Sequence, residues 1–327
     1  MFKYCPAKAC EQRGRPVRDA AQSTCTACGA WLTVELERGD VVLGFEVLVK
    51  LPEGDGGMAT VYRARHRALR QHVALKVCRD RPYEYSALQR EAQALRALQH
   101  PHIVKIIRVP AVREQDAYVP KTYMAGEPRC FIALEFVDGA SLRRRLANAK
   151  HLTWPDVARV TRQVGLALSF AHSKGFLHLD VKPSNVLLAK GGKHAVLTDF
   201  GLVLPSDTGR RTGEGQRLLG TAGYMSPEHV ARERLDYRSD IFSLGVVVYE
   251  MLTGVAPFAR KETSDTLKAV LRRDTVPPSR HLPGLPAAAD AVVMKALARE
   301  RGERYQSTKD LVEDLERALG VGHGIFG

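Results

Sequence analysis

Long apolar runs are missing from this sequence of 327 residues. No stretch reaches the roughly 18 consecutive apolar residues that a membrane-spanning helix needs. The most apolar segment, 241–252, is shorter and contains Glu250. The first residues, Met1 to Cys5, also lack the apolar core of a signal peptide. From these two absences we expect a cytoplasmic protein without a membrane span.

Cysteine is scarce outside the N-terminus, because four of the six cysteines are Cys5, Cys10, Cys25 and Cys28. Two close pairs can supply four thiolates to one tetrahedral ion. So short a segment buries too little apolar surface to fold alone, so a metal would supply most of its folding energy. The pattern is similar to a zinc ribbon and predicts structural Zn²⁺ in residues 1–33. Disulfides or unrelated thiols are the alternatives.

Acidic residues are outnumbered by basic ones, 36 to 49, which gives a net charge of +13. A solvated basic face accounts for this, and a surface for acidic substrates or nucleic acid is the alternative. The sequence does not decide between them, so a nucleic-acid partner has no specific support. The remaining cysteines, Cys78 and Cys130, stand alone in expected strands and are interpreted as core residues.

The densest group of chemically useful side chains lies in residues 178–185. Asp180, Lys182 and Asn185 supply a carboxylate, a cation and an amide from one short loop, and Asp199 follows with a second carboxylate. Such a set suits a divalent cation and a phosphate chain beside a hydroxyl nucleophile. The loop and the following Asp-Phe-Gly resemble the H-R-D-L-K-x-x-N and D-F-G motifs of the eukaryotic-like protein kinases.

Upstream segments resemble the same family in the right order. Glycines in residues 51–62 lie between alternating apolar residues, which indicates a hairpin whose backbone can approach phosphate. Their spacing resembles G-x-G-x-x-G-x-V, with Ala59 in place of the third glycine. Gly-Gly-Met at 56–58 resembles the bacterial branch of the family.

The segment 73–77 resembles the family's V-A-I-K motif and places Lys76 inside an apolar strand. A buried lysine is costly without a counter-charge. An amphipathic helix is expected over 84–98, and Glu91 on it matches the family's glutamate that pairs with this lysine.

Farther on, 131–139 resembles the strand and hinge between the kinase lobes. Two strands are expected between 104 and 130, with the connection 109–128 either a solvated loop or a docking element.

Helical patterning dominates the remainder. Helices are expected over residues 141–149, 154–174, 237–253, 287–298 and 308–319.

The predicted fold class is α+β, a bilobal protein-kinase fold with a small β-rich N-lobe and a large helical C-lobe, preceded by the zinc-ribbon-like module. The expected domains are a four-cysteine module at 1–33, a linker at 34–43, a kinase domain at 44–319 divided at 136/137, and a tail at 320–327.

The resemblance implies a Ser/Thr protein kinase that uses ATP and Mg²⁺ (or Mn²⁺), phosphorylates proteins and phosphorylates itself. The implied cofactor-binding residues are Gly54, Gly56, Ala59, Val61, Ala74, Lys76, Leu134, Glu135, Val137, Leu187, Asn185 and Asp199. The last two would hold the metal. Leu134 is the implied gatekeeper, Leu187 the floor, and the backbone of Glu135 and Val137 would bind the adenine edge.

The implied catalytic residues are Asp180, Lys182, Lys76, Glu91 and Thr221. Asp180 would orient the substrate hydroxyl and accept its proton, and Lys182 would neutralise charge on the transferred phosphoryl group. Thr221 would contact both of them, which favours a Ser/Thr substrate. Two further contacts are interpreted as structural, Glu228 with Arg304 and Asp240 with the catalytic loop.

One residue departs from the family pattern, because Leu179 replaces the arginine that normally binds a phosphate on the activation loop. We therefore expect activity to depend little on phosphorylation of Ser206, Thr208 and Thr212. The alternative functions are a pseudokinase or scaffold, and an adaptor in which the four-cysteine module binds protein or nucleic acid.

Overall fold

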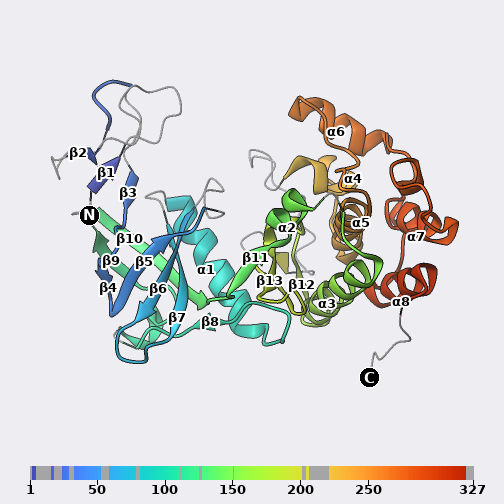
Figure 1. Ribbon diagram of the computed structural model, residues 1–327. Helices are drawn as coiled ribbons and strands as arrows, with labels where there is room; N and C mark the ends of the chain where they lie inside the picture. Colours follow the sequence, from blue (N-terminus) through green and yellow to red (C-terminus); the bar gives the residue numbers. More distant parts are fainter. Residues whose placement is uncertain are drawn as a thin grey trace. The chain divides into compact units, whose positions relative to one another are not determined.

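The computed structural model describes most of the chain (Figure 1). The described residues are 2–4, 16–17, 24–28, 33–52, 59–78, 82–110, 112–124, 127–149, 151–200, 204–205 and 221–321. The chain divides into two compact units. Unit 1 comprises Met1–Arg96 with Lys105–Phe136, and unit 2 comprises Ala97–Val104 with Val137–Gly327.

Unit 1 is built on two antiparallel sheets. The smaller sheet has the order β2-β1-β3 and is formed by Phe2–Tyr4 (β1), Pro16–Val17 (β2) and Thr33–Glu35 (β3). The larger sheet has the order β4-β5-β6-β7-β10-β8, with β9 paired to β10. Its strands are Val41–Val42 (β4), Phe45–Lys50 (β5), Ala59–His66 (β6), His72–Cys78 (β7), Ile106–Ile107 (β8), Lys121–Met124 (β9) and Glu127–Glu135 (β10).

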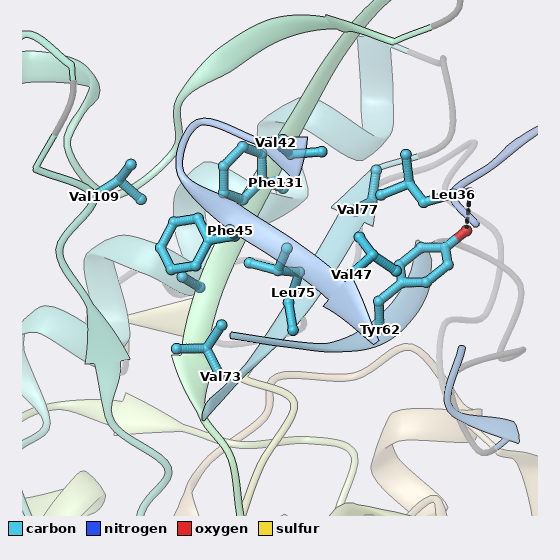
Figure 2. Packing of buried hydrophobic residues seen from close by; sticks show 12 residues of the cluster. Leu36, Val42, Phe45, Val47, Tyr62, Val73, Leu75, Val77, Val109 and Phe131 are labelled. Atoms are coloured by element: carbon cyan, nitrogen blue, oxygen red, sulfur yellow. Dashed lines mark hydrogen bonds between the residues drawn. The ribbon is translucent and has the colours of Figure 1, made fainter. Parts of the chain in front are cut away.

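The larger sheet buries one face in an apolar cluster that includes Phe45, Tyr62, Leu75 and Phe131 (Figure 2). Side chains alternate across a strand, so Leu75 faces this cluster while its neighbour Lys76 faces the other way. Alternation therefore lets one strand serve the core and a polar site at once. Cys78 and Cys130 are both buried, as the sequence predicted.

Residues expected to form a linker at 34–43 are in fact part of this unit. They contain the end of β3 and all of β4, and Leu36 is only 6% exposed within the apolar cluster. A single leucine among charged residues gives no periodic signal, which is why the sequence suggested a linker.

The long helix of unit 1, α1 (Pro82–Ala97), begins two residues before its expected start. The connection at 109–128 is more structured than a solvated loop, because Ala117 is fully buried and its carbonyl accepts a hydrogen bond from Val109 N–H at 2.7 Å. Two cations also lie over aromatic rings, Arg96 of α1 over Tyr118 and Lys121 of β9 over Tyr85 of α1.

Unit 2 is mainly helical. Its helices are Leu142–Asn148 (α2), Trp154–Ser173 (α3), Pro227–Val230 (α4), Tyr237–Thr253 (α5), Thr263–Arg272 (α6), Ala287–Ala296 (α7) and Thr308–Leu319 (α8). The five expected helices are present with ends that agree within two residues. The sequence did not predict α4 and α6.

The central helix of unit 2 is α5, which is buried from Ser239 to Leu252. Asp236 caps its N-terminus by accepting from Arg238 N–H, and Gly254 ends it in a left-handed conformation with φ of 74°. Among the described residues, no helix is both long and apolar enough to cross a membrane.

Short strands complete unit 2. Gly139–Ser141 (β11), Val186–Ala189 (β13) and Ala195–Leu197 (β14) form one sheet in the order β11-β13-β14, and Phe176–Leu177 (β12) pairs with Leu204–Pro205 (β15). Strand β12 and the β13–β14 hairpin flank residues 178–185, the expected catalytic loop.

Candidate active site

Unit 1 contains the predicted ion pair. Lys76 Nζ lies 2.7 Å from Glu91 Oε2, and the two side chains are 16% and 2% exposed. Strand β7 carries the lysine and α1 carries the glutamate. Opposite charges at this distance offset the cost of removing each from water. The lysine is therefore held in one place on the sheet.

Neighbouring strands place the other expected unit 1 residues around this lysine. Val61 on β6 is the cross-strand partner of Lys76, and Ala74 on β7 is the partner of Leu134 on β10. Ala59 is 7% exposed at the start of β6. Register alone thus collects these side chains at one region of the sheet.

The end of β10 is held by a reciprocal pair of hydrogen bonds. Glu135 N–H donates to the Lys105 carbonyl at 2.8 Å, and Lys105 N–H donates to Glu135 Oε1 at 3.0 Å. The Glu135 N–H is thus already engaged. The expected partner Val137 begins the second stretch of unit 2, and Leu187 lies on β13 opposite Ser141 and Val196.

The catalytic-loop residues of unit 2 converge on Asp180. Lys182 Nζ lies 2.7 Å from Asp180 Oδ2, and Asn185 Nδ2 donates to the same oxygen at 3.0 Å and to the Asp180 carbonyl at 2.9 Å. Asp180 is 8% exposed. The carboxylate is therefore oriented by two donors from its own loop.

The β13–β14 hairpin brings the two expected metal-binding residues together. Val186 pairs with Leu197, and Thr198 N–H donates to the Asn185 carbonyl at 2.9 Å, immediately before Asp199. Asp199 has a left-handed backbone with φ of 67°.

The amide of Asn185 is also oriented for a metal. Because its Nδ2 is bound to Asp180, its Oδ1 is the atom that can serve a cation. An amide oxygen with a nearby carboxylate is the hard donor set that Mg²⁺ prefers. The residues present therefore fit the ion that the sequence motifs imply.

Buried Asp240 of α5 holds the start of the catalytic loop, as the sequence suggested. Its Oδ2 accepts from His178 N–H at 2.9 Å and from His172 Nε2 at 2.8 Å, while Oδ1 accepts from Leu179 N–H at 2.7 Å. Burial acts to raise the pKa of Asp240, but the hydrogen bond and charge of His172 outweigh it and leave the pKa below its usual value.

His178 adds a second support inside the loop. Its Nδ1 accepts from Asp180 N–H at 3.2 Å, so its Nε2 carries the proton and donates to the Thr198 carbonyl at 3.1 Å. Phe200 packs edge-on against the imidazole, with ring centroids 4.6 Å apart. One imidazole therefore links the catalytic loop to the segment that carries Asp199.

The expected contact of Thr221 with Asp180 and Lys182 is not formed. Thr221 is exposed, and in the described part of the chain its hydroxyl makes no hydrogen bond to either residue. Lys182 and Asn185 already occupy Asp180 Oδ2.

The predicted pair of Glu228 and Arg304 is present and fully buried. Arg304 Nη1 and Nη2 donate to the two Glu228 oxygens at 2.8 and 2.7 Å. Burial acts to raise the pKa of Glu228, but the Arg304 hydrogen bonds outweigh it and lower the pKa below its ordinary value.

Sequence reasoning missed a polar cluster in which Arg143 of α2 lies 2.6 Å from Glu250 of α5 and also donates to the Tyr224 hydroxyl, which in turn donates to Glu250. Burial, and then the charge of Glu250, raises the pKa of Tyr224. The three residues are far apart in sequence and no local pattern joins them.

Several expected residues lie outside the described part of the chain. These are Gly54, Gly56, Cys5, Cys10, Ser206, Thr208 and Thr212. Of the other two predicted zinc ligands, Cys25 is buried and Cys28 is exposed. Within the described residues, no group of three or more His, Cys, Asp or Glu side chains is arranged to hold a metal ion.

A known family and several known proteins are similar to most of this chain. A family model described as "Protein kinase domain" matches residues 45–314. The chain is 37% identical over 269 residues to the serine/threonine-protein kinase PknB of Mycobacterium tuberculosis, covering 81% of this chain and 41% of that protein. It is 31% identical over 268 residues to a probable serine/threonine-protein kinase of Clostridium perfringens, covering 81% and 37%. The chain thus spans about two fifths of the length of these curated relatives.

Proposed function

This chain belongs to the protein kinase family, and we propose that it transfers the γ-phosphoryl group of ATP to Ser and Thr hydroxyls of proteins, including its own. The observation that carries this proposal is the arrangement around Asp180, where a lysine and an asparagine from the same loop converge on one carboxylate. Relatives named as serine/threonine-protein kinases support the choice of substrate hydroxyl.

Asp180 would accept the proton of the substrate hydroxyl. Its Oδ2 is held by Lys182 and Asn185, so Oδ1 is the oxygen that would face the incoming alcohol. Lys182 would neutralise charge on the transferred group, and Lys76, fixed by Glu91, would bind the α- and β-phosphates. Positioning and charge stabilisation would therefore provide nearly all of the catalysis.

Asn185 Oδ1 and Asp199 would hold Mg²⁺ or Mn²⁺, which neutralises phosphate charge when bound. For the adenine, Leu134 would act as the gatekeeper, Val61 would cover one face of the base with Ala74 beside it, and Leu187 would form the floor. The Glu135 N–H is engaged by Lys105, so the carbonyl of Glu135 and the backbone of Val137 would bind the adenine edge. Gly54, Gly56 and Ala59 would line the phosphates.

The test is transfer of label from γ-³²P-ATP by the purified full chain with Mg²⁺, to itself and to a generic protein substrate. Asp180→Asn should lower the rate roughly a hundred- to ten-thousand-fold. Asp265→Asn, the same chemical change at an exposed residue of α6, should leave the rate unchanged. Transfer at background level in both the wild-type chain and Asp180→Asn would instead favour the pseudokinase or scaffold function.

The proposed role of Thr221 belongs to a later step, the binding of a peptide substrate. We propose that it contacts Asp180 and Lys182 only when a peptide substrate is bound. Thr221→Ser should then retain most of the transfer rate and Thr221→Val should lose it, and equal rates in both variants would contradict this role.

Activity would depend little on phosphorylation of Ser206, Thr208 and Thr212. The supporting observation is that Leu179, where the family usually has arginine, is 6% exposed and packs with Leu177 and Leu235. An apolar side chain in such a cluster cannot bind phosphate. The triple alanine variant should retain most of the wild-type activity, and a fall to background would refute this proposal.

The N-terminal module would bind structural zinc. What supports this is the small sheet β2-β1-β3, because Cys5 and Cys10 fall between β1 and β2 while Cys25 and Cys28 fall between β2 and β3. Ligand pairs in two successive connections of one sheet suit a tetrahedral thiolate site. The full chain purified without added metal should contain about one zinc per molecule, and Cys28→Ser should reduce that content.

The same module would be the surface for any adaptor partner. Deletion of residues 1–33 should abolish partner binding but not transfer to a generic substrate if the module is an adaptor. Insolubility of the deletion would instead indicate a structural cap.

A further inference from the structure

Two consecutive residues at the end of the small N-terminal sheet contact the large sheet of unit 1. Glu35, the last residue of β3, lies 2.9 Å from Lys50 Nζ at the end of β5. Leu36 N–H donates to the Tyr62 hydroxyl on β6 at 3.0 Å (Figure 2). Two adjacent residues, Glu35 and Leu36, therefore contact two adjacent strands, β5 and β6.

These two contacts are made to one cross-strand pair of the β5–β6 hairpin, Lys50 and Tyr62, here termed the rung. The next backbone bond runs from Leu51 N–H to the Val61 carbonyl at 2.8 Å. The chain then continues into residues 53–58, which lie outside the described residues. Glu35 and Leu36 thus hold the two strands that lead into and out of the glycine-rich segment.

The hydrogen bond of Leu36 is the stronger of the two contacts. Leu36 is 6% exposed and Tyr62 is fully buried, and both belong to the apolar cluster of the large sheet (Figure 2). A buried N–H that loses its acceptor destabilises the structure by more than the bond itself contributes. The side chains of Glu35 and Lys50 are 38% and 32% exposed, so solvent weakens their attraction.

The rung is also connected to the lysine of the candidate active site. Val61 is the neighbour of Tyr62 on β6, on the side of the glycine-rich segment. It is the cross-strand partner of Lys76, which is bound to Glu91. A shift of Tyr62 would move Val61 with it, because adjacent residues of a strand share one rigid backbone. The path from Leu36 to Lys76 therefore runs through two adjacent residues of β6, Tyr62 and Val61.

We propose that Glu35 and Leu36 couple the N-terminal module to nucleotide binding, with Tyr62 as a positioning residue for Val61 and Lys76. A change in the small sheet, which ends at Glu35, would then alter the affinity for ATP. This inference rests on the proposed function only in taking ATP as the ligand.

The test measures Mg–ATP binding to the full chain by titration calorimetry, together with KM and kcat. Tyr62→Phe removes only the hydroxyl that accepts from Leu36 N–H. We expect ATP affinity to fall about three- to tenfold, the equivalent of one lost hydrogen bond, while kcat at saturating ATP stays within about twofold. A purely structural role would lower the melting temperature and leave ATP affinity unchanged, and that result would overturn the proposal.

The matched control is Glu46→Gln. Glu46 pairs with Arg65 at 3.0 Å at the other end of the same two strands, so its loss perturbs the sheet away from the rung. This variant should bind ATP as the wild-type chain does. Equal losses of affinity in Tyr62→Phe and Glu46→Gln would refute a specific role for the rung.

A second pair of variants applies if Tyr62→Phe does not fold. Glu35→Lys should weaken ATP binding about two- to fourfold, and the double variant with Lys50→Glu should restore it, because the pair is exchanged in place. No loss in Glu35→Lys, or no recovery in the double variant, would count against the coupling. If the wild-type chain binds no ATP, the proposed function itself fails.

Discussion

At the scale of single residues, Asp240 holds the start of the loop 178–185. It accepts from two backbone N–H groups of the loop and from His172, with no exposure to solvent. Asparagine at this position keeps one oxygen but turns an amide toward donors. We expect Asp240→Asn to lower the unfolding free energy by about 1–3 kcal/mol. It should lower kcat about a hundredfold through misplacement of Asp180.

The measurement for Asp240→Asn is denaturant unfolding alongside steady-state kinetics. KM for ATP should change little, because the hydrogen-bond partners of Asp240 are His172, His178 and Leu179, none of which is expected to bind nucleotide. A variant that kept wild-type kcat would show that the loop is held in place without this carboxylate.

Glu228 and Arg304 give a pH-dependent prediction. The pKa of Glu228 is below its ordinary 4.5 in the folded chain, so this group stabilises the fold above that pH. The contribution is lost as the pH falls through the lowered folded pKa. Glu228→Gln leaves Arg304 buried without a charged partner, and we expect a loss of about 3–5 kcal/mol at pH 7.

The stability difference between the wild-type chain and Glu228→Gln should narrow as the pH falls below about 4. Urea unfolding across a pH series measures it. The exposed Glu262→Gln is the control and should change stability by less than about 0.5 kcal/mol at any pH. A difference that did not change with pH would contradict the assigned pKa direction.

Which single residues could be predicted from the sequence depended on whether they belong to a short motif. Lys76, Glu91 and the residues around Asp180 were identified because they lie in short motifs that resemble those of the protein kinases, and because a lysine in an apolar strand requires a counter-charge. Tyr224, Arg143 and Glu250 were not found, because the three come from separate elements and only folding brings them together. Thr221 shows the reverse case, where the motif suggested a contact that the fold leaves unmade.

At the scale of elements, the approach of α5 to α7 requires a small residue. A Cβ added at Gly245 of α5 would lie 2.8 Å from Ala296 Cβ and 3.3 Å from Leu297 Cδ2. Both neighbours are buried, so the two helices would have to separate. We expect Gly245→Ala to lower the unfolding free energy by about 1–3 kcal/mol despite the better helix propensity of alanine.

Calorimetric melting of Gly245→Ala should be compared with that of Gly302→Ala. Gly302 is in the same unit and has open space where a Cβ would be added. The control should change stability by less than about 0.5 kcal/mol. Equal melting temperatures for the two variants would mean that α5 and α7 adjust without strain.

The elements that the sequence missed share a physical cause. Helix α6 spans only Thr263–Arg272 and buries only Thr266, Ala269 and Val270. Strands β8 and β9 lie where two strands were expected between 104 and 130, but β10 extends farther toward the N-terminus than the apolar run suggested. In both cases tertiary contacts, rather than local preference, decide the structure.

At the scale of the whole molecule, ligand binding should raise the stability of the folded chain. If the proposed function is right, Mg–ATP at about 100 times its dissociation constant should add about 2.7 kcal/mol to the unfolding free energy. Asp180→Asn should show the same increase, because Asp180 would serve the hydroxyl rather than the nucleotide. Lys76→Met should show a smaller one.

Thermal melting with and without Mg–ATP measures this effect, with Mg²⁺ alone as the control. An unchanged melting temperature in the wild-type chain would show that the chain does not bind the nucleotide. An increase in Lys76→Met as large as in the wild-type chain would contradict the role proposed for that lysine.

The edge strands of the large sheet of unit 1 are short, with two residues in β4 (Val41–Val42) and β8 (Ile106–Ile107) and four in β9, which in the described part of the chain pairs only with β10. A row of backbone groups this short offers little template for a foreign strand. On the ribosome, unit 1 is completed while much of unit 2 is still to be made. The short edge strands would keep newly folded unit 1 from pairing with a neighbouring nascent chain while unit 2 is synthesised.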